Sequence, residues 1–135
     1  MSKRTNIICI VGLPGSGKTF LAQQKCLETG GIVLDDITSF KDVASAIRDY
    51  DFIYITDPHF CIPEIKNSAE RKLSSLADNI NLEWIYFEND VEKCLSNIKF
   101  RNDKRNVRPT IDIYSKIYVP PEEALSIWQS NSKEK

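Results

Sequence analysis

The chain has 135 residues, and its 18 basic and 19 acidic side chains nearly cancel, leaving a formal net charge of -1. This length favours one domain with a single sizeable core, and the charge balance excludes a global basic field of the kind that attracts nucleic acid, though not a local basic patch. No apolar run approaches the ~20 residues of a membrane-spanning helix, and no signal-peptide pattern precedes the first apolar run. We therefore expect a cytoplasmic protein that does not partner with a membrane.

The first apolar run leads directly into a glycine-rich loop. Asn6–Val11 ("NIICIV") has the length and composition of a strand that is buried on both faces. Gly12–Thr19 ("GLPGSGKT") matches the phosphate-binding pattern G-x-x-x-x-G-K-[ST]. A helix-compatible segment, "KTFLAQQKCLET", follows and ends at Gly30 and Gly31. Strand, loop and helix in this order predict a nucleotide-binding P-loop.

The loop residues have distinct expected tasks. Glycines let the backbone N–H groups turn toward an anion. We expect ATP to be bound by residues Leu13, Gly15, Ser16, Gly17, Lys18 and Thr19. Lys18 supplies positive charge for the β- and γ-phosphates and is therefore also a catalytic candidate, while the hydroxyl of Thr19 can ligate Mg²⁺.

Further strands and helices alternate along the chain. We expect strands at 32–34, 51–57 and 82–88, helices from Ser39, from near Pro63 and from Asn89 to Ile98, and shorter helices within 110–118 and 119–130. Asn89 and Glu92 predict a capping box for the helix that follows the last strand. This alternation predicts an α/β fold of the P-loop NTPase class, a three-layer α/β/α sandwich with a mainly parallel sheet of about four to five strands. Residues 1–130 are expected to form one P-loop kinase domain, and 131–135 a polar tail.

Carboxylates follow each predicted strand after the loop. Because ligands of parallel α/β sheets bind beyond the carboxyl ends of the strands, Asp35, Asp36, Asp57 and Glu88 are expected to gather on the rim that carries the loop. Asp35 is the candidate base for an acceptor hydroxyl, and Asp57 is the candidate carboxylate of the Mg²⁺ shell. The alternative for each is a carboxylate that caps a helix or turns the chain.

A basic run lies near the end of the chain. Six Lys and Arg residues fall between Lys93 and Arg108. Arg101 and Arg105 are one helical turn apart, so both side chains can point the same way. We interpret the segment around 99–110 as an arginine-bearing lid over the triphosphate and both arginines as catalytic candidates; the alternative is a solvated face.

The cysteines and the histidine carry weaker signals. The four cysteines are scattered without zinc-ligand spacing, and we interpret them as buried free thiols of a reducing compartment. A lone histidine in a loop is more often without a catalytic role than a general base, and we interpret His59 in "DPHF" in this way. Trp84 and Trp128 are interpreted as core residues.

Four stretches in order resemble the kinase domain of phage polynucleotide kinase and related small P-loop kinases: "GLPGSGKT", the "DD" pair at 35–36, "IYITDPHFCIPEIKNSAERKL", and "CLSNIKFRNDKR" followed by "IDIYSKIY". The resemblance covers about residues 6–118. It implies ATP and Mg²⁺ as cofactors, with Lys18 holding the β- and γ-phosphates, Asp35 accepting the proton of the acceptor, and Arg101 or Arg105 stabilising the transferring group. The family's acceptor-gripping arginine is replaced by Thr38, so the acceptor carries over less well than the chemistry.

These patterns support two functional hypotheses. The first is an ATP-dependent phosphotransferase whose acceptor is a hydroxyl of a nucleic acid, a nucleoside or nucleotide, or a related small molecule. The second is a nucleotide-dependent regulatory protein with little or no kinase activity, which needs the loop and the Mg²⁺ ligands but no base such as Asp35. A motor-type ATPase is the weaker third alternative, because the only arginine cluster is suited to act within its own chain.

Overall fold

A computed structural model describes residues 4–35, 40–100 and 107–127 of the chain. The described strands are β1 (Thr5–Val11), β2 (Ile32–Asp35), β3 (Phe52–Thr56) and β4 (Ile80–Tyr86). The helices are α1 (Lys18–Thr29), α2 (Phe40–Asp49), the 3-10 helix η1 (Pro58–Cys61), α3 (Pro63–Ser74), α4 (Val91–Phe100) and α5 (Arg108–Ser115). The predicted succession of strands and helices is confirmed as far as α5.

The four strands form a parallel sheet in the order β2-β3-β1-β4. The centre of the sheet is β1, where Ile7 pairs with Ile53 on one side and with Leu82 on the other. Its residues from Ile7 to Val11 are all buried, which explains why this strand is a continuous apolar run instead of an alternating one. The predicted α/β fold with a mainly parallel sheet is confirmed.

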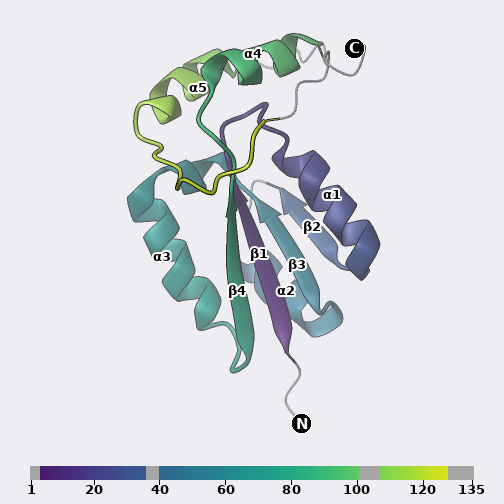
Figure 1. The fold of residues 1–135 in the computed structure, drawn as a ribbon. Coiled ribbons are helices and arrows are strands. Elements are labelled where there is room, and N and C mark those ends of the chain that lie inside the picture. The colour runs from purple at the N-terminus through teal and green to yellow at the C-terminus, as the bar shows by residue number, and fades with distance from the viewer. Residues whose placement is uncertain (1–3, 36–39, 101–106, 128–135) are drawn as a thin grey trace.

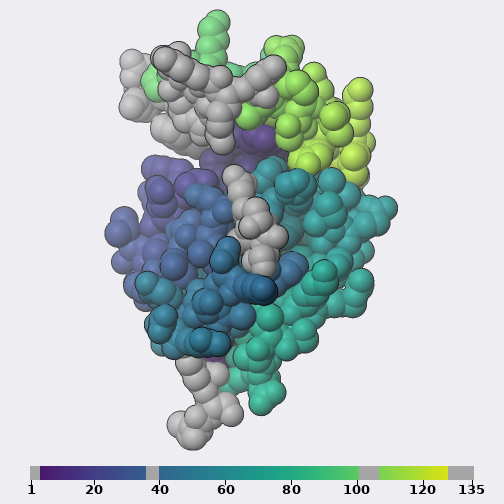
Figure 2. All heavy atoms as spheres, turned by 180° about the vertical axis from the view of Figure 1, so that it is seen from behind, coloured from purple at the N-terminus to yellow at the C-terminus, as the bar shows by residue number. Residues whose placement is uncertain are grey.

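Helices cover both faces of the sheet and so complete three layers. The first helix, α1, packs against β2 and β3, whereas α2 and α3 contact each other on the opposite face. Figure 2 shows that opposite face from behind, with α4 and α5 beyond the carboxyl end of the sheet. Because all four strands are parallel, their carboxyl ends lie at the same edge of the sheet, the edge nearer to α4 and α5.

The segment 118–127, which we call the strap, lies beside the end of β4 (Figure 1). The prediction of a helix at 119–130 is wrong for its described residues, since 119–127 contain no helix. Leu125 instead pairs with Phe87 as a parallel bridge; its N–H donates to the carbonyl of Tyr86 (2.7 Å), and its carbonyl accepts from the N–H of Glu88 (2.8 Å). At the outer edge of β4, the carbonyl of Tyr86 and the N–H of Glu88 have no neighbouring strand to bond. Hydrogen bonds to these groups stabilise the strap more than a short helix would.

The start of α4 also differs from the prediction. The side chain of Asp90, not that of Asn89, accepts from the backbone N–H of Lys93 (3.1 Å). The Asn89 amide instead donates to the carbonyls of Ser115 (2.7 Å) and Tyr118 (2.9 Å), which ties the end of α5 to the end of β4. The predicted capping box is therefore wrong, and Asn89 joins two elements that are distant in sequence.

All four cysteines are free thiols, with Cys9, Cys61 and Cys94 buried and Cys26 half-buried. Trp84 lies within β4, where its ring packs edge-to-face on Phe60. Within the described ranges, no helix combines the length and the apolar character that crossing a membrane requires.

Candidate active site

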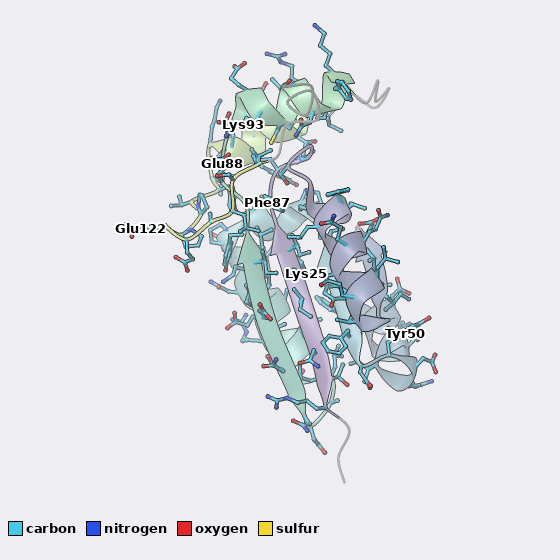
Figure 3. The ribbon with its side chains drawn as sticks, turned by 45° about the vertical axis from the view of Figure 1, so that its right-hand side comes forward. Lys25, Tyr50, Phe87, Glu88, Lys93 and Glu122 are labelled. Carbon is cyan, nitrogen blue, oxygen red and sulfur yellow. The ribbon has the colours of Figure 1, made fainter. Side chains whose placement is uncertain are left out.

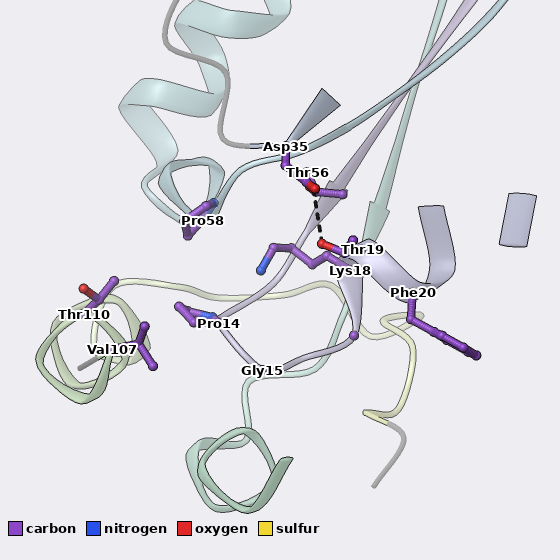
Figure 4. A pocket seen from close by; sticks show the side chains of 11 residues that line it. Pro14, Gly15, Lys18, Thr19, Phe20, Asp35, Thr56, Pro58, Val107 and Thr110 are labelled. Carbon is purple, nitrogen blue, oxygen red and sulfur yellow. Dashed lines mark hydrogen bonds between the residues drawn. The ribbon is translucent and has the colours of Figure 1, made fainter. Parts of the chain in front are cut away.

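A cleft of about 370 Å³ opens at the carboxyl edge of the sheet, between the P-loop, the ends of β2 and β3, and the start of α5. Its lining consists of Pro14, Gly15, Gly17, Lys18, Thr19, Phe20, Asp35, Thr56, Pro58, Val107 and Thr110. Figure 4 shows the Lys18 side chain extending between Pro14 and Pro58, with Val107 and Thr110 across from it. The cleft thus combines the predicted phosphate loop with a carboxylate from the neighbouring strand.

The backbone of the loop requires glycine at two of its turns. Gly15 and Gly17 have φ angles of 88° and 101°, in the left-handed region that side chains disfavour. A Cβ on Gly15 would also lie 2.5 Å from the carbonyl oxygen of Cys94, and the Gly15 carbonyl accepts from the Asn97 side chain (2.9 Å). The loop is therefore seated on α4, which holds its curvature in place.

The loop fits a chain of phosphate groups. The hydroxyl of Ser16 is buried and has no partner among the described residues, so a donor inside the loop is open to an anionic oxygen. The α1 helix begins beyond Gly17 with no side-chain cap and no acidic residue in its first turn, which leaves its positive end facing the loop. Lys18 is only 9% exposed, and its ammonium group donates to the carbonyl of Leu13 (3.1 Å). These are the groups that would contact the phosphates of a nucleotide.

Asp35 lies in the cleft beside the P-loop. Its Oδ1 accepts from the hydroxyl of Thr19 (3.1 Å) and from the hydroxyl of Thr56. Figure 4 shows this contact between the candidate base and the candidate Mg²⁺ ligand. A threonine hydroxyl has one proton and two lone pairs, so Thr19 can donate to Asp35 while a lone pair ligates a metal ion.

Thr56 is a site residue that the sequence analysis missed. It is buried and pairs in parallel register with Asp35 across β2 and β3. The signal was present, because two neighbouring parallel strands that end together bring their last residues side by side. Pro58 also lines the cleft, and no comparable signal in the sequence points to it, whereas Val107 and Thr110 line the cleft from the segment 99–110 that we interpret as a lid.

The other predicted rim carboxylates have different surroundings. Asp57 is 5% exposed and caps η1, and its Oδ1 accepts from the backbone N–H of His59 (2.9 Å) and lies 2.7 Å from the ring Nδ1 of His59. Glu88 accepts from the ammonium of Lys93 and from the N–H of Ile127, both at 2.8 Å. Neither carboxylate lines the cleft, so of the three expected rim carboxylates that the structure describes, Asp35 alone reaches it.

Two buried thiols lie beneath the loop. Burial raises the pKa of Cys61 to about 12, against the opposing effects of the Lys18 charge and the Gly12 backbone. Burial likewise raises the pKa of Cys94 to about 12, again against the Lys18 charge. Both thiols are therefore held in the protonated form, which is a poor nucleophile.

The described residues contain no cluster of three His, Cys, Asp or Glu side chains that could hold a metal ion by themselves. A metal ion in this cleft would instead need Thr19 together with phosphate oxygens and water, which is the ordinary way in which Mg²⁺ is bound beside a nucleotide. Arg101 and Arg105, with Asp36 and Thr38, lie outside the described residues.

No known family model matches the sequence. The chain is 35% identical over 120 residues to "Uncharacterized protein R277" of Acanthamoeba polyphaga mimivirus, an alignment that covers 83% of this chain and 85% of the viral protein.

Two solved structures are similar in fold. One is a gluconokinase from Sinorhizobium meliloti 1021, with a TM-score of 0.65 and 10% identity, covering 98% of this chain and 88% of that one. The other is APE1195, with a TM-score of 0.60 and 20% identity, covering 98% and 90%. At these identities the structural similarity establishes the fold alone, whereas the sequence match to the viral protein establishes a shared family. The chain therefore belongs to the same family as the mimivirus protein, and its fold is that of the P-loop kinases.

Proposed function

We propose that this protein is an ATP-dependent kinase of the polynucleotide kinase-like type, which moves the γ-phosphate of ATP to a hydroxyl of a nucleic acid, a nucleoside or nucleotide, or a related small molecule. The observation that carries the proposal is the position of Asp35. Its carboxylate lines the cleft that holds the P-loop lysine and is hydrogen-bonded to Thr19 and Thr56. Phosphoryl transfer uses a general base for the acceptor hydroxyl, and a protein that only binds nucleotide does not require one.

Lys18 and the loop amides would hold the β- and γ-phosphates, with the Ser16 hydroxyl as a further donor. Thr19 would ligate Mg²⁺, which when bound offsets the charge of the phosphate oxygens. We keep Asp57 as a candidate for the outer part of the metal shell. Its Oδ1 is engaged with His59, so that role requires its carboxylate to turn or to act through water.

Asp35 would act on the acceptor. The carboxylate accepts the proton of the acceptor hydroxyl while the acceptor oxygen bonds to the γ-phosphorus. The bond from that phosphorus to the β–γ bridging oxygen breaks, and ADP leaves. The hydroxyls of Thr19 and Thr56 both bind Oδ1 and therefore fix the orientation of the carboxylate toward the cleft.

Transfer from γ-labelled ATP to a panel of acceptors tests this proposal. The panel contains 5′-hydroxyl DNA and RNA, nucleosides, nucleotides and sugars. Asp35→Asn keeps the shape of the side chain and one acceptor oxygen but removes the base, so transfer to the true acceptor should fall about 10²–10⁴-fold. ATP affinity, measured by calorimetry, should change little in this variant. Lys18→Ala is the control for lost nucleotide binding, with an expected loss of about tenfold to a hundredfold in ATP affinity from a missing charge-assisted contact.

A regulatory nucleotide-binding protein would behave differently. No acceptor in the panel would become labelled, and Asp35→Asn would leave both ATP binding and slow hydrolysis nearly as in the wild type. That pattern would replace the kinase proposal with the regulatory one.

A further inference from the structure

The strand β4 lies at an edge of the sheet, and most of its outer side pairs with no other strand among the described residues. It pairs with β1 on its inner side, and on its outer side the strap bonds the carbonyl of Tyr86 and the N–H of Glu88. The strand is seven residues long, has no proline and carries a single charged side chain, Glu83. Figure 1 shows it at the border of the sheet opposite β2. An edge of this length and composition readily pairs with another strand.

The free backbone groups of this edge belong to alternate residues. The N–H of Phe87 donates to the carbonyl of Val11 at the end of β1, so the odd-numbered residues of β4 direct their backbone groups toward β1. The even-numbered residues therefore direct theirs outward, which is the side on which the strap bonds Tyr86. The outward groups that have no hydrogen-bond partner among the described residues belong to Ile80, Leu82 and Trp84.

The two faces of this edge differ in polarity. The ring of Trp84 lies on the α3 face, with the ammonium of Lys66 4.8 Å from its centroid, and the half-buried side chains of Ile80 and Leu82 follow on the same face by alternation. The other face presents Asn81 and Glu83, which are both exposed. A strand that alternates in the same way would match both faces, and β4 is itself such a strand. The other edge strand, β2, has only four residues.

We propose that the outer edge of β4 binds the same edge of a second copy of the chain. Two identical edges related by a twofold axis run antiparallel, and the contact closes into a dimer instead of growing into a filament. The two four-stranded sheets then form one continuous sheet. This inference goes beyond the proposed function and does not depend on it.

The strap determines where the twofold axis lies. With the axis at Leu82, this residue faces its own copy, and Ile80 of each chain faces Trp84 of the other. Outward residues that face each other in an antiparallel pair exchange both of their hydrogen bonds, so all the free groups find partners. No group that the strap already bonds is needed. A shifted register with Ile80 opposite Tyr86 would instead compete with the strap for the Tyr86 carbonyl.

The polar face favours the same register. With the axis at Leu82, Asn81 of each chain lies opposite Glu83 of the other. One N–H of the Asn81 amide donates to Oδ1 of Asn6 (3.0 Å), and the amide has a second N–H that can donate to the carboxylate. The shifted register would place Glu83 opposite Glu83, and like charges directly opposite each other destabilise a strand pair.

Sedimentation equilibrium of the full chain over a range of concentrations measures the dimer and its Kd. Asn81→Glu places a carboxylate opposite Glu83 at both symmetry-related contacts, so the Kd should rise about tenfold. Adding Glu83→Lys to this variant creates an attractive pair and should return the Kd to within a few-fold of the wild type. The charge-matched control is Gln24→Glu, at an exposed position of α1, which packs against β2 and β3. This control should leave the Kd unchanged.

Amide hydrogen exchange locates the contact within the dimer. The N–H groups of Leu82 and Trp84 should exchange rapidly in dilute protein and become protected as the dimer forms. The N–H of Glu83 points toward β1 and should be protected at every concentration, which makes it an internal control in the same strand. No described residue of β4 lines the P-loop cleft, so unchanged ATP affinity of Asn81→Glu shows that this variant is folded.

Three results would overturn the proposal. The first is a protein that stays monomeric up to about 1 mM, because the edge would then supply too little binding free energy to hold a partner. The second is a dimer in which the amides of Leu82 and Trp84 remain unprotected. The third is a dimer that Asn81→Glu and Gln24→Glu weaken equally.

Discussion

Gly15 and Gly30 share a left-handed backbone but differ in what surrounds them. Their φ angles are 88° and 76°, yet a Cβ would lie 2.5 Å from the Cys94 carbonyl at Gly15 and would meet nothing within 4 Å at Gly30. Alanine at Gly30 should therefore cost only the strain of the backbone, about 1–2 kcal/mol. Gly15→Ala should cost more, because α4 or the loop must move, and it should weaken ATP binding as well.

Chemical denaturation measures the two stabilities, and calorimetry measures ATP affinity. If Gly15→Ala binds ATP as well as Gly30→Ala does, ATP binding by the loop does not depend on the contact between Gly15 and α4. Equal losses of stability in the two variants would lead to the same conclusion, because the contact with the Cys94 carbonyl would then add nothing to the strain of the backbone.

Individual site residues could be predicted where a sequence pattern fixes both chemistry and position. The P-loop pattern located Lys18 and Thr19, and the end of the second strand located Asp35. The pattern that selected Asp57 was similar, a carboxylate directly after an apolar strand. The structure bonds Asp57 to the backbone and ring of His59, a local contact that a strand-end pattern does not encode. The roles of these residues remain predictions until the variants above are measured.

The strap is held at the end of β4 by Glu88. The Lys93 ammonium and the Ile127 N–H both donate to one oxygen of this carboxylate. The hydrogen bond from Lys93, and then the one from Ile127, lower the pKa of Glu88 below its ordinary value of 4.5. Figure 3 shows Glu88 and Lys93 beside each other where β4 meets α4.

Removing this carboxylate should make stability depend on pH in a specific direction. Because the folded-state pKa of Glu88 is lowered, its contribution is fully present above pH 4.5 and is lost as the pH falls through the lowered pKa. Glu88→Gln should therefore lower the Tm at neutral pH, and the difference from wild type should vanish in acid. Thermal unfolding followed in steps down to about pH 3 measures this. Glu83→Gln, an exposed position of β4, is the control and should show no such convergence.

A helix or a strand could be predicted from the sequence where the pattern of its own residues determines its structure. The strand β1 and the helices α1, α3 and α5 follow the sequence pattern closely. The strap does not, because its backbone is organised by a partner 38 residues earlier in the chain, Phe87 against Leu125. A bridge between distant segments leaves no local period, so the helix expected within 119–130 is wrong for the described residues.

At the scale of the molecule, the parallel sheet places the loop, Asp35 and the start of α5 around one cleft. The alternation of strands and helices is sufficient to predict that the loop and Asp35 share this edge, since parallel strands present their carboxyl ends on one side. The acceptor was not predictable in the same way. The P-loop pattern and the strand ends that located the cleft do not encode which acceptor enters it.

Arg101 and Arg105 fall between α4 and α5 in the sequence. Their proposed role joins two distant parts of the molecule, because a lid formed by this segment would act on a nucleotide that the P-loop holds. Charge near the migrating group matters most in the transition state, so Arg101→Gln with Arg105→Gln should lower kcat by about 10³-fold or more. ATP affinity should change only a few-fold, since ground-state binding is supplied by the loop and Lys18.

The charge-matched control is Lys99→Gln with Arg108→Gln, two exposed residues at the end of α4 and the start of α5. Single-turnover transfer from γ-labelled ATP separates chemistry from binding in both double variants. Equal, small effects of the two pairs would mean that the basic segment is a solvated face and that another group stabilises the transferring phosphate.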